Sequence, residues 1–209
     1  GVGEPDARGD RIFNGAMDNA SGTAALVELA RGFAAQPAPQ RSVLFLAVTA
    51  EEKGLLGSEY YASHPLYPLA KTVAVINMDG MSPYSPSRDF GIYGSAKVEL
   101  LDQLKDVAKG WDIRYTPDPK PEAGLFFRSD HFPFAKRGVP ALSYAAGQDW
   151  IDGGVAAGKQ ASDDYTAKRY HQKDDEWQPD WGFAGAVRDL EVVYTLGEQL
   201  ANSRNWPNC

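Results

Sequence analysis

Cysteine is almost absent from this sequence of 209 residues, because the only one is the last residue, Cys209. With no second cysteine to pair with it, a disulfide within the chain is excluded. Long hydrophobic runs are absent too, and without about 18 consecutive apolar residues no segment is predicted to span a bilayer. Basic residues are outnumbered, with 21 Lys and Arg against 28 Asp and Glu and a net charge of −7. This balance argues against nucleic acid as the main partner and provides no polybasic patch for a membrane surface.

A glycine-rich phosphate loop is also absent, because the opening GVGEP has neither a strand before it nor a helix after it. The longer opening stretch, GVGEPDARGDRIFNGAMD, lacks the period of a helix or a strand and has the character of an internal loop. The rest of the composition, 43% apolar and 23% charged with 21 Gly and 14 Pro, is typical of a globular protein with long loops. We therefore expect residues 1–209 to form a single domain, the C-terminal part of a longer protein.

Two apolar patterns alternate along the chain. Helical spacing predicts helices, and continuous apolar runs between turns predict strands that are buried on both faces. The predicted helices cover 21–35, 55–63, 96–110 and 181–203, and the predicted strands cover 41–50, 72–80, 89–94 and 139–147. This alternation indicates an α/β fold, a three-layer α/β/α sandwich around a mixed, mainly parallel sheet. Two long stretches without a period, 112–130 and 146–169, are expected to be irregular loops that wall or cover a site, or else plain insertions.

Acidic residues stand where the predicted strands end. Glu51 and Glu52 follow the apolar run VLFLAVTA, and burying either carboxylate costs several kcal/mol unless a cation or a proton compensates it. Asp79 ends the next strand, Asp18 lies on a turn before the first helix, and His171 lies in a loop before the last helix. Singly, each is more typical of a helix cap or a solvated strand end. Together they form an oxygen and imidazole set that suits Zn²⁺ or a similar divalent ion.

Five stretches of this sequence carry a family resemblance. They are NGAMDNASGTAALVELAR, VTAEEKGLLGSEYY, INMDG, SDHFPFAKRGVPAL and YHQKDDE, in that order from about residue 14 to the last helix. Together they resemble the co-catalytic di-zinc aminopeptidases, a zinc exopeptidase family that also contains glutamate carboxypeptidase-like enzymes and glutaminyl cyclases. The resemblance implies a metallopeptidase acting on peptide substrates.

The resemblance also implies which residues bind metal. Asp18 would bridge two zinc ions in the parent enzyme. Glu52 and His171 would complete the coordination of one zinc, and Asp79 would bind the other.

Catalytic roles follow from the same likeness. Glu51 would act as general base and then general acid, taking a proton from the bridging water and passing it to the leaving amine. Tyr170 would donate a hydrogen bond to the oxyanion of the tetrahedral intermediate. The bond between Asp18 and Asn19 would be cis, and Asn19 would support the metal ligands.

Three further polar residues keep two interpretations each. Asp130 and His131 either form a polar turn that caps a helix starting near Pro133 or line the substrate pocket, as this region does in the family. Asp175 either supports the metal ligands from behind or caps the last helix.

One element of the family pattern is missing. A His-x-Asp motif at the end of an earlier core strand supplies the second zinc with its histidine, yet no histidine precedes His64 here. We therefore expect this chain to lack one or more N-terminal strands, to bind one zinc or none tightly, and to be impaired relative to its parent. A missing strand would also leave an unpaired sheet edge open to self-association.

Other functions remain open on the same scaffold. A glutaminyl-cyclase-like zinc acyltransferase and a non-catalytic relative are the alternatives, although the retained acidic residues favour a peptidase. The absence of an arginine cluster for a terminal carboxylate favours an aminopeptidase over a carboxypeptidase. The resemblance implies a secreted or periplasmic location.

Overall fold

The computed structural model describes residues 1–94 and 98–208 and contains a four-stranded sheet at its centre. The strands are β1 (Val75–Met78), β2 (Asp89–Ile92), β3 (Arg114–Tyr115) and β4 (Ala141–Ala146), and their order in the sheet is β1-β4-β2-β3. β1 pairs in parallel with β4, and β2 in parallel with β3, whereas β2 and β4 are antiparallel. The predicted mixed α/β sheet is thereby confirmed.

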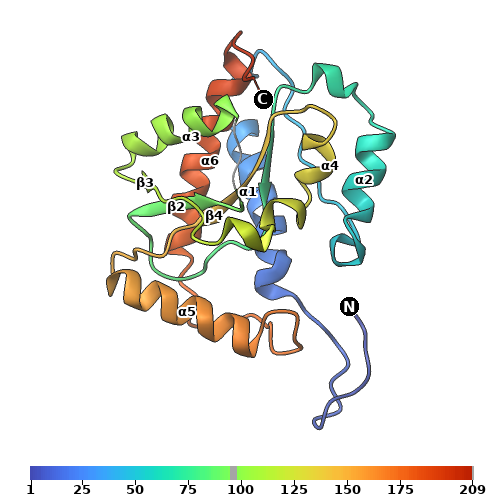
Figure 1. Cartoon of the computed structure of the whole chain (residues 1–209), viewed down its shortest axis with the longest axis vertical. Coiled ribbons are helices and arrows are strands. Elements are labelled where there is room, and N and C mark those ends of the chain that lie inside the picture. The colour runs from blue at the N-terminus through green and yellow to red at the C-terminus, as the bar shows by residue number, and fades with distance from the viewer. Residues whose placement is uncertain (95–97, 209) are drawn as a thin grey trace.

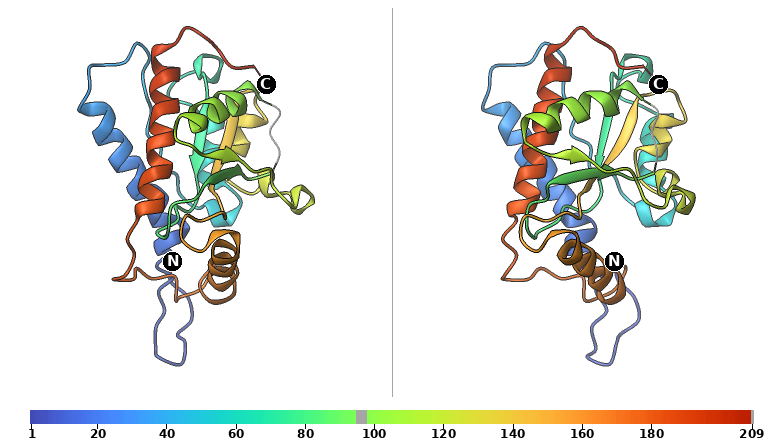
Figure 2. Two further views of the ribbon diagram at one scale, coloured as in Figure 1. Left: turned by 90° about the vertical axis from the view of Figure 1, so that its left-hand side faces the viewer. Right: turned by 60° about the vertical axis from the view of Figure 1, so that its left-hand side comes forward.

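Helices cover both faces of the sheet, which gives the predicted three layers (Figure 1). One layer contains α1 (Gly22–Ala34), α3 (Glu99–Gly110) and α6 (Ala184–Asn202), and the other contains α2 (Leu56–Ser63) and α4 (Phe132–Ala135). Figure 2 shows α1 and α6 side by side on one face of the sheet. α5 (Gly154–Lys168) lies apart from these layers, at the end of the sheet near the N-terminus (Figure 1).

The core forms where the apolar stripes of α3 and α6 meet the sheet. Leu100 and Leu104 of α3, and Val192 and Leu196 of α6, are almost fully buried. The two residues of each pair are four positions apart and so lie on one helix face, which explains why these segments fold as helices against the sheet. Phe90 of β2 and Leu142 of β4 pack in the same cluster, whereas Ala62, Phe134 and Val139 form a separate, smaller cluster with α2 and α4.

The strand predicted at 41–50 is not present as a strand. Residues 42–50 carry no helix or strand in the structure, and Leu44 is 49% exposed despite its apolar surroundings in the sequence. Apolar composition made the stretch resemble a buried strand, but a strand also needs a hydrogen-bonded neighbour. None of the described strands pairs with it. A cavity lies between this segment and β1.

The irregular loop predicted at 146–169 is also wrong, because most of it forms α5. Gly158 is the buried residue of this helix, so the sequence has no apolar period to reveal it. Ion pairs one turn apart on its exposed surface, Lys159 with Asp163 and Lys168 with Asp164, support the helix instead. The other predicted loop, 112–130, contains β3 and two short 3₁₀ turns.

The remaining predicted elements are confirmed with small shifts of their ends. Positions 96 and 97 of the predicted helix 96–110 lie outside the described residues. Ser21 precedes α1 but does not cap it, because its hydroxyl donates to the Met17 carbonyl and accepts from the Met81 N–H. Among the described residues, no helix combines the length and apolar character needed to cross a membrane.

Candidate metal and catalytic site

Three predicted metal ligands meet at one end of the sheet. His171 Nε2 lies 2.9 Å from a carboxylate oxygen of Glu52 and 3.3 Å from one of Asp18. One potential ligand atom from each residue lies within 4.8 Å of the other two, close enough for all three to coordinate a single ion. They come from three distant parts of the chain, so the fold brings them together.

Local backbone geometry presents two of these groups. Glu52 belongs to a single 3₁₀ turn, Glu51–Lys53, that directly follows the apolar segment 42–50. His171 has a left-handed backbone with φ of 57°, which turns the chain sharply after α5 and points the ring at the two carboxylates. The sequence carries no specific signal for this turn, because a left-handed backbone is uncommon for any residue other than glycine.

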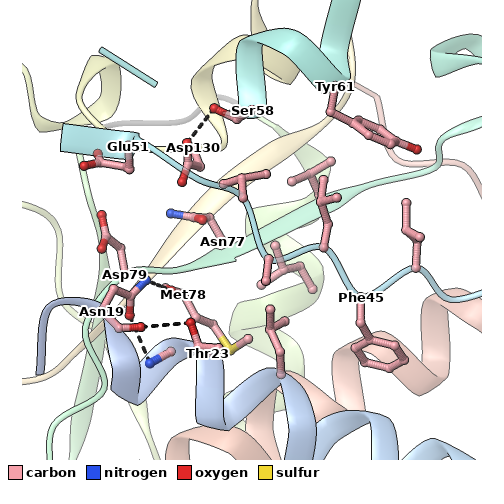
Figure 3. Close-up of a pocket in the computed structure, with 18 of the residues that line it drawn as sticks. Asn19, Thr23, Phe45, Glu51, Ser58, Tyr61, Asn77, Met78, Asp79 and Asp130 are labelled. Atoms are coloured by element: carbon pink, nitrogen blue, oxygen red, sulfur yellow. Dashed lines mark hydrogen bonds between the residues drawn. The ribbon is translucent and has the colours of Figure 1, made fainter. Parts of the chain in front are cut away.

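The turn that carries Asp18 is fastened to the end of β1 by the neighbouring side chain. Asn19 donates from its amide nitrogen to the Met78 carbonyl at 3.0 Å (Figure 3). Its amide oxygen accepts from the N–H groups of Gly22 and Gly80. The Asp18–Asn19 peptide bond is cis, as the resemblance implied.

Asp175, which is 1% exposed, also holds the turn that carries Asp18 in place. Its carboxylate accepts hydrogen bonds from the backbone N–H groups of Met17 and Asp18, at 3.1 and 3.0 Å. It does not cap α6, which begins at Ala184. Of the two interpretations of Asp175, the structure agrees with the one in which its carboxylate supports the turn that carries Asp18.

Glu51 and Asp79 extend the group of carboxylates toward β1. Figure 3 shows the Asp79 carboxylate pointing toward Glu51 across the head of a pocket. Burial, followed by the charges of Asp79 and Glu52, raises the pKa of Glu51 to about 8. Burial, again with Asp79 and Glu52, raises the pKa of Asp18 to about 7. The site therefore has an excess of negative charge that a cation would neutralise.

Asp79 is held by two residues that sequence analysis missed. Ser129 donates its hydroxyl hydrogen to Asp79 at 2.6 Å, and the Asn77 amide donates to Ser129 at 2.7 Å and to Ser143 at 3.0 Å. Ser129 lies within the quoted stretch SDHFPF and Asn77 within INMDG. Because these stretches carry the family resemblance, the positions of Ser129 and Asn77 within them were a sequence signal that could have identified the two residues as part of the site.

Tyr170 lies beside the three ligands. Its ring stacks on that of His171 with centroids 3.8 Å apart, and its side chain remains partly exposed. Burial, followed by the charges of Asp18 and Glu52, raises the pKa of Tyr170, so its hydroxyl keeps its proton and is available as a donor.

The two candidate substrate residues have different positions. Asp130 lines the same pocket as Glu51, and its carboxylate accepts a hydrogen bond from Ser58 at 2.5 Å (Figure 3). His131 is fully buried and packs edge-on against Phe126, and neither of its ring nitrogens has a hydrogen-bond partner among the described residues. Burial lowers the pKa of His131 to about 4, so the ring is neutral. His131 precedes the first residue of α4 without capping it through its side chain.

The donor set at this site fits a zinc ion. One imidazole and two carboxylates provide three protein ligands, which is the usual number where a fourth position is left for water or substrate. Asp79 is not part of this group of three, although its charge contributes to the raised pKa of Asp18.

Comparison with known proteins decides the family. A model of peptidase family M28 matches residues 2–195. The chain belongs to peptidase family M28. This M28 chain is 46% identical over 142 residues to aminopeptidase YwaD of Bacillus subtilis, covering 64% of this chain and 29% of that protein.

One further sequence relative and one solved structure are also similar to the M28 chain. It is 29% identical over 154 residues to leupeptin-inactivating enzyme 1 of Streptomyces exfoliatus, covering 72% of this chain and 34% of that protein. The LapA aminopeptidase of Legionella pneumophila has a similar fold, with a TM-score of 0.71 at 18% identity over 94% of this chain and 49% of LapA. The chain thus spans about a third of the two curated relatives.

Proposed function

We propose that residues 1–209 form the catalytic domain of a zinc-dependent aminopeptidase. The observation that carries this proposal is the meeting of Asp18, Glu52 and His171 around one ligand position, beside Glu51, in an M28 chain. Relatives named as aminopeptidases support the substrate class. A secreted or periplasmic location remains an expectation from the family resemblance.

Asp18, Glu52 and His171 would hold the zinc ion. Zinc bound there would supply a Lewis acid for the scissile carbonyl and would lower the pKa of water. The buried support of Asp18 by Asp175 keeps one ligand in place before the ion arrives, which reduces the ordering that binding requires.

Glu51 is the proposed general base. Its carboxylate lies beside the ligand group without belonging to it, so it remains free to accept a proton from the attacking water. The same group then donates that proton to the leaving amine. In this half-buried position the carboxyl is more basic than an exposed glutamate, which suits the return of the proton.

Substrate would be oriented by two further side chains. The Tyr170 hydroxyl, protonated at neutral pH, would donate to the oxyanion that forms at the scissile carbonyl. The carboxylate of Asp130 lines the pocket and would accept a hydrogen bond from the free amino group of the peptide.

We further propose that this chain is impaired as an enzyme. A second metal position would have Asp79 and the shared Asp18, and the described ligand group places no second histidine with them: His64 stacks on Tyr60, and the ring of His131 is buried against Phe126. One zinc at most is therefore expected to bind tightly, and the hydrolytic rate should be far below that of a complete relative.

Zinc content and peptide hydrolysis together test the proposal. After equilibration with zinc and removal of the excess, we expect one zinc or less per chain, lost in His171→Ala and Glu52→Ala but kept in the matched control His64→Ala. Residual hydrolysis should require a free N-terminus, so an N-acetylated peptide should not be cleaved. Zinc binding unaffected by His171→Ala would refute the metal site, and ammonia release from an N-terminal glutamine peptide would indicate a glutaminyl cyclase instead.

A further inference from the structure

Asparagine is followed by glycine at one place in the sequence, Asn14-Gly15. The side-chain amide of asparagine is chemically labile, and glycine as the next residue leaves the amide carbon open to attack because it has no Cβ. Asn14 is also exposed, so water reaches its side chain. The pair lies directly before the turn that carries Asp18. Each of the other asparagines precedes a larger residue: Ala20, Met78, Ser203, Trp206 and Cys209.

The backbone of Gly15 keeps its nitrogen available for reaction. Its φ of 61° is left-handed, and a Cβ there would lie 2.3 Å from the Asp18 carbonyl oxygen, so the turn requires glycine. The Gly15 carbonyl accepts a hydrogen bond from the Ala20 N–H at 2.9 Å. The Gly15 N–H, in contrast, donates to none of the residues that the structure describes. This nitrogen is therefore neither shielded by a side chain nor held by an acceptor, and it can approach the side chain of Asn14.

The amide of Asn14 holds the loop after His171 through Glu176. Its nitrogen donates to a carboxylate oxygen of Glu176 at 3.1 Å. Two residues after Asn14, the Ala16 N–H donates to the Asp175 carbonyl at 2.9 Å. Loss of the amide would remove the donor, and a carboxylate in its place would repel that of Glu176. The chemical state of Asn14 therefore affects the contact between two segments that carry proposed metal ligands.

We propose that Asn14 is a site of spontaneous covalent modification, converted to aspartate and isoaspartate in the folded protein, and that the conversion loosens the loop after His171. The Gly15 nitrogen attacks the amide carbon Cγ of Asn14, and the new C–N bond closes a succinimide ring. The bond from Cγ to Nδ2 breaks, and Nδ2 leaves as ammonia with the proton lost from the Gly15 nitrogen. Water then opens the ring, because its hydroxyl adds to a carbonyl carbon and its proton returns to the nitrogen. Water alone is consumed, and no oxidant or reductant takes part.

The two products have different consequences. Opening of the ring at the side-chain carbonyl leaves an aspartate on an unchanged backbone. Opening at the backbone carbonyl leaves an isoaspartate, which routes the chain through the side chain and adds one methylene directly before Gly15. Because Gly15 turns the chain toward Asp18, this product should also displace the turn that carries a proposed metal ligand. The inference stands on Asn14, Gly15 and Glu176 and does not rest on the proposed peptidase activity.

Peptide mapping of aged protein tests the modification, with a control asparagine in the same fragment. The full chain is kept folded in mildly alkaline buffer for days and is then digested with trypsin at mildly acidic pH, with an unaged sample as the blank. Cleavage after Arg11 and Arg31 releases one peptide that contains both Asn14 and Asn19. We expect at least ten-fold more conversion to aspartate and isoaspartate at Asn14 than at Asn19.

Asn14→Gln is the matched variant, because its longer side chain would have to close a larger and less favourable ring. Residue 14 of this variant should stay unmodified over the same period. Equal conversion at Asn14 and Asn19 would overturn the proposal. Conversion in the isolated tryptic peptide but not in the folded chain would also overturn it, because the folded backbone would then prevent the reaction.

Hydrogen exchange tests the effect on the loop after His171. Asn14→Asp carries the carboxylate of the first product and should speed exchange of the Ala16 amide several-fold. Glu176→Gln keeps an acceptor but removes its charge, so Asn14→Asp combined with Glu176→Gln should exchange at the rate of the parent. An Ala16 amide that exchanges no faster in Asn14→Asp, or equally fast in the single and the combined variants, would contradict the proposed loosening.

Discussion

The backbone N–H of Asp18 donates to the carboxylate of Asp175 at 3.0 Å, which links the turn before α1 to the loop that follows His171. Asp175 lies four residues after His171, so one buried carboxylate holds the turn of one proposed ligand and belongs to the loop of another. The hydroxyl of Tyr165, near the end of α5, also donates to it at 3.3 Å. The geometry of the proposed metal ligands therefore depends on a residue that would not itself touch the metal.

Replacing Asp175 by alanine should weaken both the fold and the site. The change leaves the N–H groups of Met17 and Asp18 without their acceptor, which should lower the free energy of unfolding by about 1–3 kcal/mol. Zinc affinity, measured by competition with a chelator, should fall about 10–100-fold. The control Asp174→Ala removes an adjacent but exposed carboxylate and should change zinc affinity little. Equal effects of the two variants would contradict a supporting role for Asp175.

Ser129→Ala should destabilise the protein through the residues that hold Asp79. Ser129 is 4% exposed, and its loss removes the donor to Asp79 and one acceptor of the Asn77 amide. We expect urea denaturation to show a loss of about 1–3 kcal/mol. Ser162→Ala, on the exposed side of α5, provides the comparison and should be neutral or slightly stabilising. A Ser129→Ala variant as stable as the parent would show that Asp79 needs no such partner.

Stability should depend on pH through Asp189, a buried residue of α6 that accepts a hydrogen bond from the Tyr144 hydroxyl. Burial raises the pKa of Asp189 from 3.8 to about 7. Between these values the folded protein binds more protons than the unfolded chain, so stability from this group is present at low pH and is lost as pH rises toward 7. The slope from this one group is at most about 1.4 kcal/mol per pH unit.

Asp189→Asn, which does not titrate, should remove that contribution. Urea denaturation from pH 5 to 8 should show the parent losing stability relative to the variant as pH rises. Asp106→Asn, at an exposed site on α3, should keep the parent's pH dependence. Parallel curves for the parent and Asp189→Asn would indicate that Asp189 titrates as it does in the unfolded chain.

Gly22→Ala should disturb the contact between α1 and the end of β1. A Cβ at Gly22 would lie 2.5 Å from the Met78 carbonyl oxygen and would also overlap the side-chain oxygen of Asn19. Because backbone lies in the way, the turn bearing Asp18 must move, and both thermal stability and zinc affinity should fall. Gly110→Ala is the matched control, because its Cβ meets nothing within 4 Å and alanine is favoured in a helix. If both variants kept zinc affinity, the close approach at Gly22 would not control the site.

The fold could be predicted for those segments whose pattern of apolar residues matches the contacts that they make in the structure. β1, β4, α3 and α6 follow directly from buried runs and helical stripes in the sequence. The meeting of Asp18, Glu52 and His171 was predictable as well, because acidic residues after strands gather at one end of a sheet and the family resemblance identified the histidine.

Other features depend on contacts that a single sequence does not reveal. The stretch 42–50 has the composition of a strand, but none of the described strands pairs with it, so composition alone did not decide its structure. α5 lacks an apolar face, and its helix had no periodic signal. Ser129 reaches Asp79 only because the loop before α4 folds back over the end of β1.

The N-terminal arm, residues 1–13, has a practical consequence for anyone preparing this protein. Lys173 bonds to the carbonyls of Glu4 and Asp10, and Arg8 pairs with Asp174, so the arm is fastened to the loop that carries His171. Figure 1 shows the C-terminus near the top of the molecule and the N-terminus in its lower half. A histidine purification tag at the first residue would bring extra imidazoles to the mouth of the carboxylate cluster and would confuse any metal count. A tag without histidine, or removal of the tag before the assay, keeps that count meaningful.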